Sequence, residues 1–431
     1  MERNRQHPAL RKFFLVIAGI LFVIAAIYGV YRVADAALNH NLLFVQSAPV
    51  SMSSVQTSMV PADSIVSSDA VSANSSGSAS STEDKNQPAV ITGIFGNFDV
   101  PARQKMKTMT LKEKVGQVFV FRCPDSGAVK TAETYQPGGY CLMASNFAGK
   151  TTAQVQNMLK SYQNASKIHM VLCCDEEGGT VVRISKYSAL SKSPFRSPQS
   201  VFQHSGMDGI YSDTVKKAQL LKNLGINLNL APVCDVSTNP SDFIYNRSFG
   251  KNAAQTADFV KTSVNAYNSQ NLSCTLKHFP GYGNNVDTHT GIAYDKRSFD
   301  TFVDSDFIPF STGIQAGAQC VLVSHNIVNC MDADYPASLS LKVHNILRKQ
   351  LNFTGVIMTD DLIMDAIRDF TGGKNPCVAA FNAGNDLLLS SDITEDFNAL
   401  YSAAQNGTVS EARIDESVLR ILAWKYKMKM I

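Results

Sequence analysis

Eight short apolar runs, spaced along residues 93–431, limit the folds open to this chain more than any other feature. They are "GQVFVFRC" (116–123), "GGYCLMA" (138–144), "MVLCCDEE" (170–177), "INLNLAPVCDV" (226–236), "CTLKHF" (274–279), "CVLVSHNIV" (320–328), "GVIMTDD" (355–361) and "NDLLLSS" (385–391). Runs that are apolar on both faces are typical of parallel strands covered by helices. The pattern therefore predicts a mainly parallel sheet within one large domain.

Amphipathic segments lie between these runs and carry helix signals. Apolar residues recur at three- and four-residue spacing, often after a Ser, Thr or Asn cap, at residues 151–165, 252–270, 340–351 and 410–430. Eight strand-helix alternations predict an α/β fold of the (β/α)₈ TIM-barrel type rather than an open doubly wound sheet. The chain has neither GxGxxG after the first strand nor GxxxxGK[ST], so a nucleotide-binding fold is disfavoured.

The N-terminus has a different character. An uncharged apolar run of nineteen residues at 13–31 follows four basic residues, which predicts a cytoplasmic N-terminus (1–12) and a transmembrane signal-anchor (13–35) with the rest exported. A cleaved signal peptide is the alternative, because small residues follow in "VADAA" at 33–37. The predicted location is the cell membrane, or the exterior if the segment is cleaved.

Residues 36–92 are rich in Ser and lack apolar periodicity, so we expect a flexible linker between the anchor and a catalytic domain at 93–431. The net charge of +3 is close to balanced and gives no indication of a nucleic-acid partner.

Nine cysteines in an exported chain suggest disulfides. Five of them lie in or beside strand-like runs, where a thiol behaves as a small apolar group: Cys173, Cys174, Cys234, Cys274 and Cys320. We therefore expect most of the cysteines to be reduced and buried.

Polar residues stand where the predicted strands end. They are Asp175, Asp235, Lys277, His278, His325, Asp360 and Asp361. In a parallel barrel these ends meet at one rim, where the active sites of such barrels lie. Because an unpaired buried charge is costly, converging charges at this rim predict a functional site rather than chance ion pairs.

The segment "KHFPGYGNNVDTHTG" (277–291) continues from the fifth run as a Gly-rich loop. Asp287 can accept a proton from one imidazole nitrogen of His289 and raise the basicity of the other, which makes an acid/base dyad. A solvated Asp-His pair in a loop is the plain alternative. A phosphate cradle is less favoured without a helix N-terminus, and a metal site lacks further ligands at a suitable spacing.

Two other patterns leave alternatives open. Asp360 and Asp361 are adjacent on a strand, so one can face the barrel mouth while the other caps the next helix, and the period does not say which. Arg183 and Arg247 each follow a run and can be structural partners of nearby carboxylates.

Four ordered motifs, "DEEGGTVVR", "APVCDV" with "NRSFG", "KHFPGYG…DTH" and "GVIMTDDL", resemble glycoside hydrolase family 3 over roughly residues 105–430. The resemblance is to its β-N-acetylglucosaminidases with a single catalytic (β/α)₈ barrel. The usual "KHFPGHG" is "KHFPGYG" here, with Tyr282 in place of His.

The resemblance implies a role for each matching residue. Asp360 is expected to be the nucleophile, His289 the general acid/base and Asp287 its orienting partner. Residues expected to bind the terminal sugar are Asp175, Arg247, Lys277 and His278, with His325 as a further contact at the rim. No metal or organic cofactor is expected, because side chains fill every role.

The expected activity is exo-hydrolysis of terminal β-linked N-acetylglucosamine from cell-wall or surface glycans, with retention through a glycosyl-enzyme. Alternatives are a β-glucosidase or β-xylosidase, a phosphorylase that uses phosphate in place of water, and a surface glycan-binding module without turnover.

Overall fold

The computed structural model describes residues 88–431. The predicted cytoplasmic segment, signal-anchor and most of the linker lie outside this range. No helix between residues 88 and 431 combines the length and the apolar character needed to cross a bilayer.

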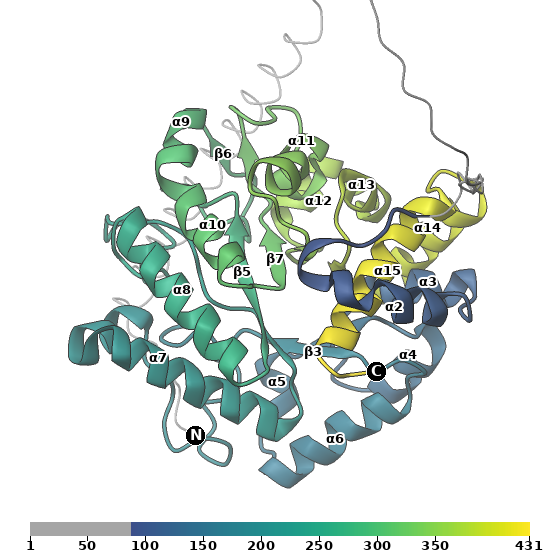
Figure 1. The fold of residues 1–431 in the computed structure, drawn as a ribbon, viewed down its shortest axis with the longest axis horizontal. Coiled ribbons are helices and arrows are strands. Elements are labelled where there is room, and N and C mark those ends of the chain that lie inside the picture. The colour runs from purple at the N-terminus through teal and green to yellow at the C-terminus, as the bar shows by residue number, and fades with distance from the viewer. Residues whose placement is uncertain (1–87) are drawn as a thin grey trace, which may run out of the picture. The chain divides into compact units, whose positions relative to one another are not determined.

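Eight parallel strands form a nearly closed barrel (Figure 1). They are β1 (Phe119–Arg122), β2 (Gly139–Cys141), β3 (Val171–Cys174), β4 (Leu228–Asn229), β5 (Ser273–Phe279), β7 (Cys320–Val323), β9 (Val356–Thr359) and β10 (Leu388–Ser390). Their order is β10-β1-β2-β3-β4-β5-β7-β9, and a parallel bridge between Met358 and Leu387 joins the two ends. Each strand matches one of the eight apolar runs, with β5 beginning one residue before its run, so the predicted barrel is confirmed.

Helices surround the strands (Figure 1). They are α2 (Asp99–Met106), α3 (Leu111–Gln117), α4 (Ala128–Tyr135), α5 (Ala144–Phe147), α6 (Thr152–Asn164), α7 (Pro198–Leu224), α8 (Ala253–Ser269), α9 (Phe299–Thr301), α10 (Phe307–Gln315), α11 (Leu341–Asn345), α12 (Asp365–Thr371), α13 (Cys377–Ala383), α14 (Ile393–Gln405) and α15 (Glu411–Lys427). Short 3₁₀ segments are η1 (Gly93–Phe98) and η3 (Ala337–Leu339), and π-helical turns are η2 (Phe302–Asp306) and η4 (Ile346–Gln350).

The predicted helix starts are correct to within a residue. Side chains of Thr151, Asn252 and Ser410 accept hydrogen bonds from backbone N–H groups in the first turns of α6, α8 and α15, which satisfies donors that a helix leaves unpaired. The segment predicted at 340–351 begins at its Ser cap but changes from α-helix to π-helix after Asn345.

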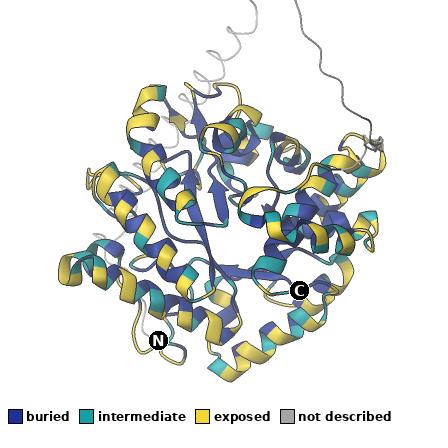
Figure 2. Cartoon of the chain, in the orientation of Figure 1, coloured by how far each residue is buried: buried dark blue, intermediate teal, exposed yellow. Residues whose placement is uncertain are grey.

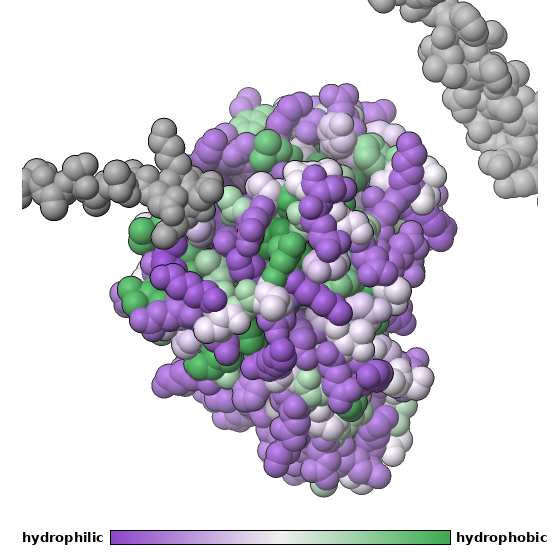
Figure 3. Space-filling view, turned by 90° about the vertical axis from the view of Figure 1, so that its right-hand side faces the viewer, coloured by the Kyte–Doolittle hydropathy of each residue, from purple (hydrophilic) through white to green (hydrophobic). Residues whose placement is uncertain are grey.

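The strands are the most buried part of the domain, whereas the outer helix faces are exposed (Figure 2). At the amino ends of the strands the indole N–H of Trp424, from α15, donates to Gln319 (2.9 Å) and Ser273 (3.2 Å). All nine cysteines are unpaired and eight are buried, as expected; Cys330 is exposed. The outer face shown in Figure 3 is mostly hydrophilic.

A second, two-stranded parallel sheet lies outside the barrel. It pairs β6 (Tyr294–Asp295) with β8 (Ile327–Val328). Because β6 follows the Gly-rich loop and β8 follows β7, this pairing fixes the end of that loop beside the carboxyl end of the barrel.

Candidate active site

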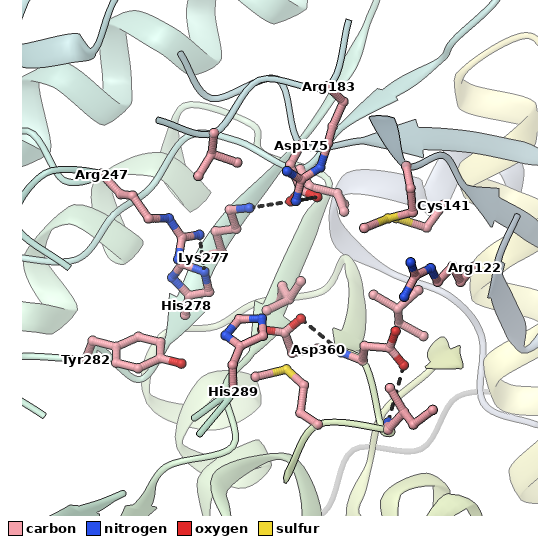
Figure 4. Close-up of a pocket in the computed structure, with 18 residues that line it drawn as sticks. Arg122, Cys141, Asp175, Arg183, Arg247, Lys277, His278, Tyr282, His289 and Asp360 are labelled. Atoms are coloured by element: carbon pink, nitrogen blue, oxygen red, sulfur yellow. Dashed lines mark hydrogen bonds and ion pairs between the residues drawn. The ribbon is translucent and has the colours of Figure 1, made fainter. Parts of the chain in front are cut away.

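A cavity of about 300 Å³ lies at the carboxyl ends of the barrel strands. Its polar lining comes from Arg122, Asp175, Arg183, Arg247, Lys277, His278, Tyr282, His289, Asp360 and Asp361 (Figure 4). Ligand pockets commonly range from about 300 to 1,000 Å³, so this cavity suits a small ligand. Six of the eight expected site residues line it; Asp287 and His325 do not.

Lys277 is held by two carboxylates. Its Nζ lies 2.7 Å from Asp175 Oδ1 and 2.7 Å from Glu177 Oε1. Burial alone lowers the pKa of Lys277, but these two carboxylates raise it above its usual value. Lys277 therefore remains charged inside the cavity, with Asp175 between it and the Arg183 guanidinium (3.3 Å).

Glu177 also fixes Arg247. Arg247 Nη2 and Nε lie 2.8 and 3.0 Å from the two Glu177 oxygens, a bidentate pair. Burial raises the pKa of Glu177, but Lys277 and Arg247 more than offset it and hold that pKa well below its usual value. Glu177 is thus a buried anion that sets the positions of two cations, an arrangement suited to binding hydroxyl groups.

The hydrogen bonds of His278 define its tautomer. Its Nδ1 lies 2.7 Å from Asp235 Oδ2, and its Nε2 lies 3.1 Å from Arg247 Nη2. Since a guanidinium can only donate, Nε2 accepts, and the single ring proton is on Nδ1. His278 is therefore neutral, with its ring held by Asp235 beneath the cavity. The peptide bond between Lys277 and His278 is cis.

Asp360 and Asp361 both line the cavity, but their environments differ. Burial raises the pKa of Asp360, whereas the Lys277 charge and the Asp361 N–H (2.9 Å) contribute to bringing it below its usual value. Burial raises the pKa of Asp361 to about 6, and the neighbouring Asp360 charge adds to this rise.

The prediction that one of these two residues faces the barrel mouth while the other caps the next helix is not met, because both line the cavity. Asp361 accepts hydrogen bonds from Ser391 Oγ (2.6 Å) and the Ile363 N–H (3.3 Å). The N-cap of α12 is Met364, so Asp361 does not cap that helix. Asp360 therefore has the lower pKa of the two carboxyls.

Asp287 and His289 form the expected dyad. His289 Nδ1 lies 2.7 Å from Asp287 Oδ1, and the His289 backbone N–H donates to the same oxygen (3.0 Å). The carboxylate thereby assigns the ring proton to Nδ1 and leaves Nε2 as the second site of proton exchange. His289 reaches the cavity while its side chain stays 60% exposed, as a group that exchanges protons with water requires.

His325 is placed differently from the expectation of a sugar contact. It is completely buried and does not line the cavity. Its Nε2 donates to the Asp361 carbonyl (3.0 Å), and its Nδ1 accepts from Ser338 Oγ (2.7 Å). The ring supports the backbone beside Asp360 from behind, and burial lowers its pKa.

Several lining or supporting residues were given no catalytic or binding role by the sequence, although Asp235 was among the polar residues at the strand ends. They are Arg122, Glu177, Arg183, Asp235 and Tyr282. Asp235 and Arg122 both lie near the ends of predicted strands, so the expectation that site residues gather at strand ends applies to both. Glu177 is two residues past Asp175, and its importance depends on a contact with Arg247, seventy residues away in sequence. Nothing local in the sequence indicates such a contact.

Within residues 88–431, no group of three or more His, Cys, Asp or Glu side chains could hold a metal ion.

The parallel α/β barrel thus carries an ionised carboxylate, an Asp-His pair and a cluster of paired cations at the carboxyl ends of its strands, where the active sites of barrel enzymes lie. The chain matches the model of the glycosyl hydrolase family 3 N-terminal domain over residues 110–424. It therefore belongs to glycosyl hydrolase family 3, as the four motifs suggested.

Relatives in this family carry related names. The chain is 30% identical to β-hexosaminidase A of Pseudoalteromonas piscicida over 68% of its length, and spans about half (54%) of that protein. It is 33% identical to a β-hexosaminidase of Xanthomonas campestris pv. campestris, covering 58% of this chain and 76% of the relative.

A solved structure is also similar. A family 3 β-N-acetylglucosaminidase from Paenibacillus sp. FPU-7 superposes with a TM-score of 0.70 and 28% identity. The match covers 75% of this chain and 63% of the other.

Proposed function

We propose that this protein is an exo-acting, retaining β-N-acetylglucosaminidase. The observation that carries the proposal is that an ionised carboxylate, Asp360, and the His289 imidazole line one small cavity. Retaining hydrolysis requires a nucleophile and a group that first gives and then takes a proton. The names of the relatives support N-acetylglucosamine as the sugar.

The proposed reaction has two displacements. Asp360 attacks the anomeric carbon, the bond to the leaving oxygen breaks, and His289 Nε2 gives its proton to that oxygen. Water then attacks the glycosyl-enzyme while His289 takes one of its protons, and the Asp360–sugar bond breaks. Asp287 stabilises the imidazolium that is present before the first step and after the second.

Sugar binding is assigned to the cluster beside the nucleophile. Lys277 and Arg247 supply N–H groups, Asp175 supplies a carboxylate, and His278 lines the same cavity. Charge-assisted hydrogen bonds to hydroxyls are strong and directional. A cavity of about 300 Å³ favours one terminal sugar over the interior of a chain, so peptidoglycan fragments and surface glycans ending in β-N-acetylglucosamine are the proposed substrates.

The test is turnover of p-nitrophenyl β-N-acetylglucosaminide by the purified chain, compared with the matching β-glucoside and β-xyloside. Asp360→Ala is expected to lower kcat by several orders of magnitude, and His289→Ala to lower it by about 10²–10⁴-fold. Azide is expected to restore turnover of the His289→Ala variant and give a β-glycosyl azide. Full activity of the Asp360→Ala variant contradicts the mechanism, and binding without sugar release supports a glycan-binding module instead.

A phosphorylase is the second candidate. Arg122 and Arg183 line the cavity, and a neutral imidazole repels an anionic acceptor less than a carboxylate does. Sugar 1-phosphate as the main product in phosphate buffer would establish phosphorolysis, whereas free sugar at every phosphate concentration would exclude it.

The proposal for the N-terminus rests on sequence alone. Residues 13–35 anchor the chain in the cell membrane, and the Ser-rich linker gives the exported domain reach toward cell-wall glycans. Fractionation of cells expressing the chain tests this, because activity released in soluble form by the intact chain contradicts an uncleaved anchor.

A further inference from the structure

The loop that carries Asp287 and His289 has a rigid stem. Arg297 lies 2.7 Å from Asp295 and 2.9 Å from Asp306, and it also donates to the Gly281 carbonyl (3.1 Å). Asn285 Nδ2 donates to Asp295 Oδ2 (2.7 Å). The two ends of the loop are therefore tied together near β6.

The tip of the loop, residues 284–292, is largely open to solvent, with one exception. Thr288 is completely buried, although its neighbours Asp287 and His289 are not. Two hydrogen bonds join it to residues outside the tip: its hydroxyl lies 2.5 Å from the Tyr282 hydroxyl, and its carbonyl accepts from the Ala366 N–H of α12 (3.3 Å). Asn285 holds the start of the tip to Asp295 and the Tyr282 carbonyl, and Thr288 fastens its middle, next to His289.

Tyr282 is itself held by the sugar-binding cluster. Its backbone N–H donates to Asp235 Oδ1 (2.7 Å), while the other oxygen of the same carboxylate holds His278. The Tyr282 ring is buried and stands edge-on to the His278 ring, with centroids 5.2 Å apart and planes at 90°. Asp235 therefore fixes both a proposed sugar contact and the residue that fastens the loop.

We infer that Tyr282 is a positioning residue that, through the Thr288 hydroxyl, holds the loop bearing His289 over the cavity. His289 follows Thr288 directly, so the hydrogen bonds of Thr288 fix the backbone from which the His289 ring reaches the cavity. The role of Tyr282 in proton transfer rests on the proposed function, whereas its role in docking the loop does not.

The inference predicts a loss confined to acid/base catalysis. A leaving group that departs easily needs little proton donation, whereas a poor one depends on it. The Tyr282→Phe change keeps the ring, its packing against His278 and the backbone bond to Asp235, and removes only the hydroxyl. We expect kcat/KM to fall by up to about tenfold for phenyl β-N-acetylglucosaminide, as for one lost hydrogen bond, and to change little for the 2,4-dinitrophenyl glycoside.

The matched control is Tyr140→Phe. Tyr140 is equally buried, and its hydroxyl donates to the Ala128 carbonyl (2.7 Å) without contacting the loop. Thr288→Ser keeps the hydroxyl and should behave as the native chain, whereas Thr288→Val should match Tyr282→Phe. The double variant Tyr282→Phe/Thr288→Val should lose no more than either single variant, because all three lack the same bond.

Hydrogen exchange separates this inference from the proposed function. In the native chain and in Tyr140→Phe, amides of residues 284–292 should exchange at the same rate, and in Tyr282→Phe they should exchange faster. Unchanged exchange in Tyr282→Phe overturns the inference, as does an equal loss on both glycosides that azide does not relieve. If the native chain lacks glycosidase activity, the proposed function fails and the exchange result alone decides whether Tyr282 docks the loop.

Discussion

A buried lysine far from the cavity gives a prediction whose size and sign follow from its surroundings. Lys425, on α15, is fully buried, and its ammonium donates to the side-chain oxygen of Gln117 (2.7 Å). No ion pair to Lys425 exists among residues 88–431. Burial lowers its pKa from 10.5 to about 7.

The magnitude follows from the shift. A difference of about 3.5 pKa units corresponds to about 5 kcal/mol in the free energy of unfolding. The folded pKa is below the unfolded value, so the unfolded chain holds this proton more tightly. The buried Lys425 charge therefore destabilises the folded chain fully below pH 7, less as the pH rises, and not at all above about pH 10.5.

Replacing Lys425 with Met removes the charge and keeps an unbranched apolar chain. It also leaves Gln117 without this partner, at a cost of about 1–3 kcal/mol. At pH 6 we expect the Lys425→Met variant to be more stable by about 2–4 kcal/mol, and at pH 10 the advantage should be gone.

The assay is urea unfolding at both pH values, followed by the fluorescence of Trp424, which is the only tryptophan in the chain and lies next to Lys425. Lys427→Met on the same helix is the control, because Lys427 is only partly buried; its stability should differ little from that of the native chain. The reasoning is refuted if Lys425→Met is no more stable than the native chain at pH 6, or if its advantage is the same at pH 10.

Two further predictions concern the cavity. Glu177→Gln leaves Arg247 without its carboxylate partner, so KM should rise and the free energy of unfolding should fall by about 3 kcal/mol at pH 7. Because the pKa of Glu177 is depressed, this loss of stability should be full above about pH 4.5 and shrink at lower pH. A loss of stability that does not depend on pH argues against the prediction. Asp361→Asn removes a carboxyl whose pKa is raised to about 6, so the native chain should lose stability as the pH rises through 6, whereas the variant should not. Urea unfolding at pH 4 and 8 should show that the difference in free energy of unfolding between the two chains changes in favour of the variant as the pH rises. The same difference at both pH values is the contrary result.

Much of the fold could be predicted because it depends on local pattern. Apolar runs without alternation indicate strands buried on both faces, and capped amphipathic segments indicate helices. The shared position of Asp175, Lys277, His278 and Asp360 at one rim could also be predicted, since the carboxyl ends of parallel strands in a barrel all point the same way.

What could not be predicted depends on distances between side chains. The position of His325 behind Asp361, rather than in the cavity, is set by packing against Ser338. Glu177 positions two cations of the cavity because it contacts Lys277 and Arg247 at the same time.

The sequence by itself determined the barrel, the rim at which polar residues gather, and the Asp287–His289 pair, because period, strand ends and a two-residue spacing are local properties. Only the tertiary structure decided that the pKa is lowered at Asp360 and raised at Asp361, and that Tyr282 is bound to Thr288. Ionisation depends on the charges and burial that surround a carboxyl in three dimensions, and a hydrogen bond exists only where folding brings its two groups together.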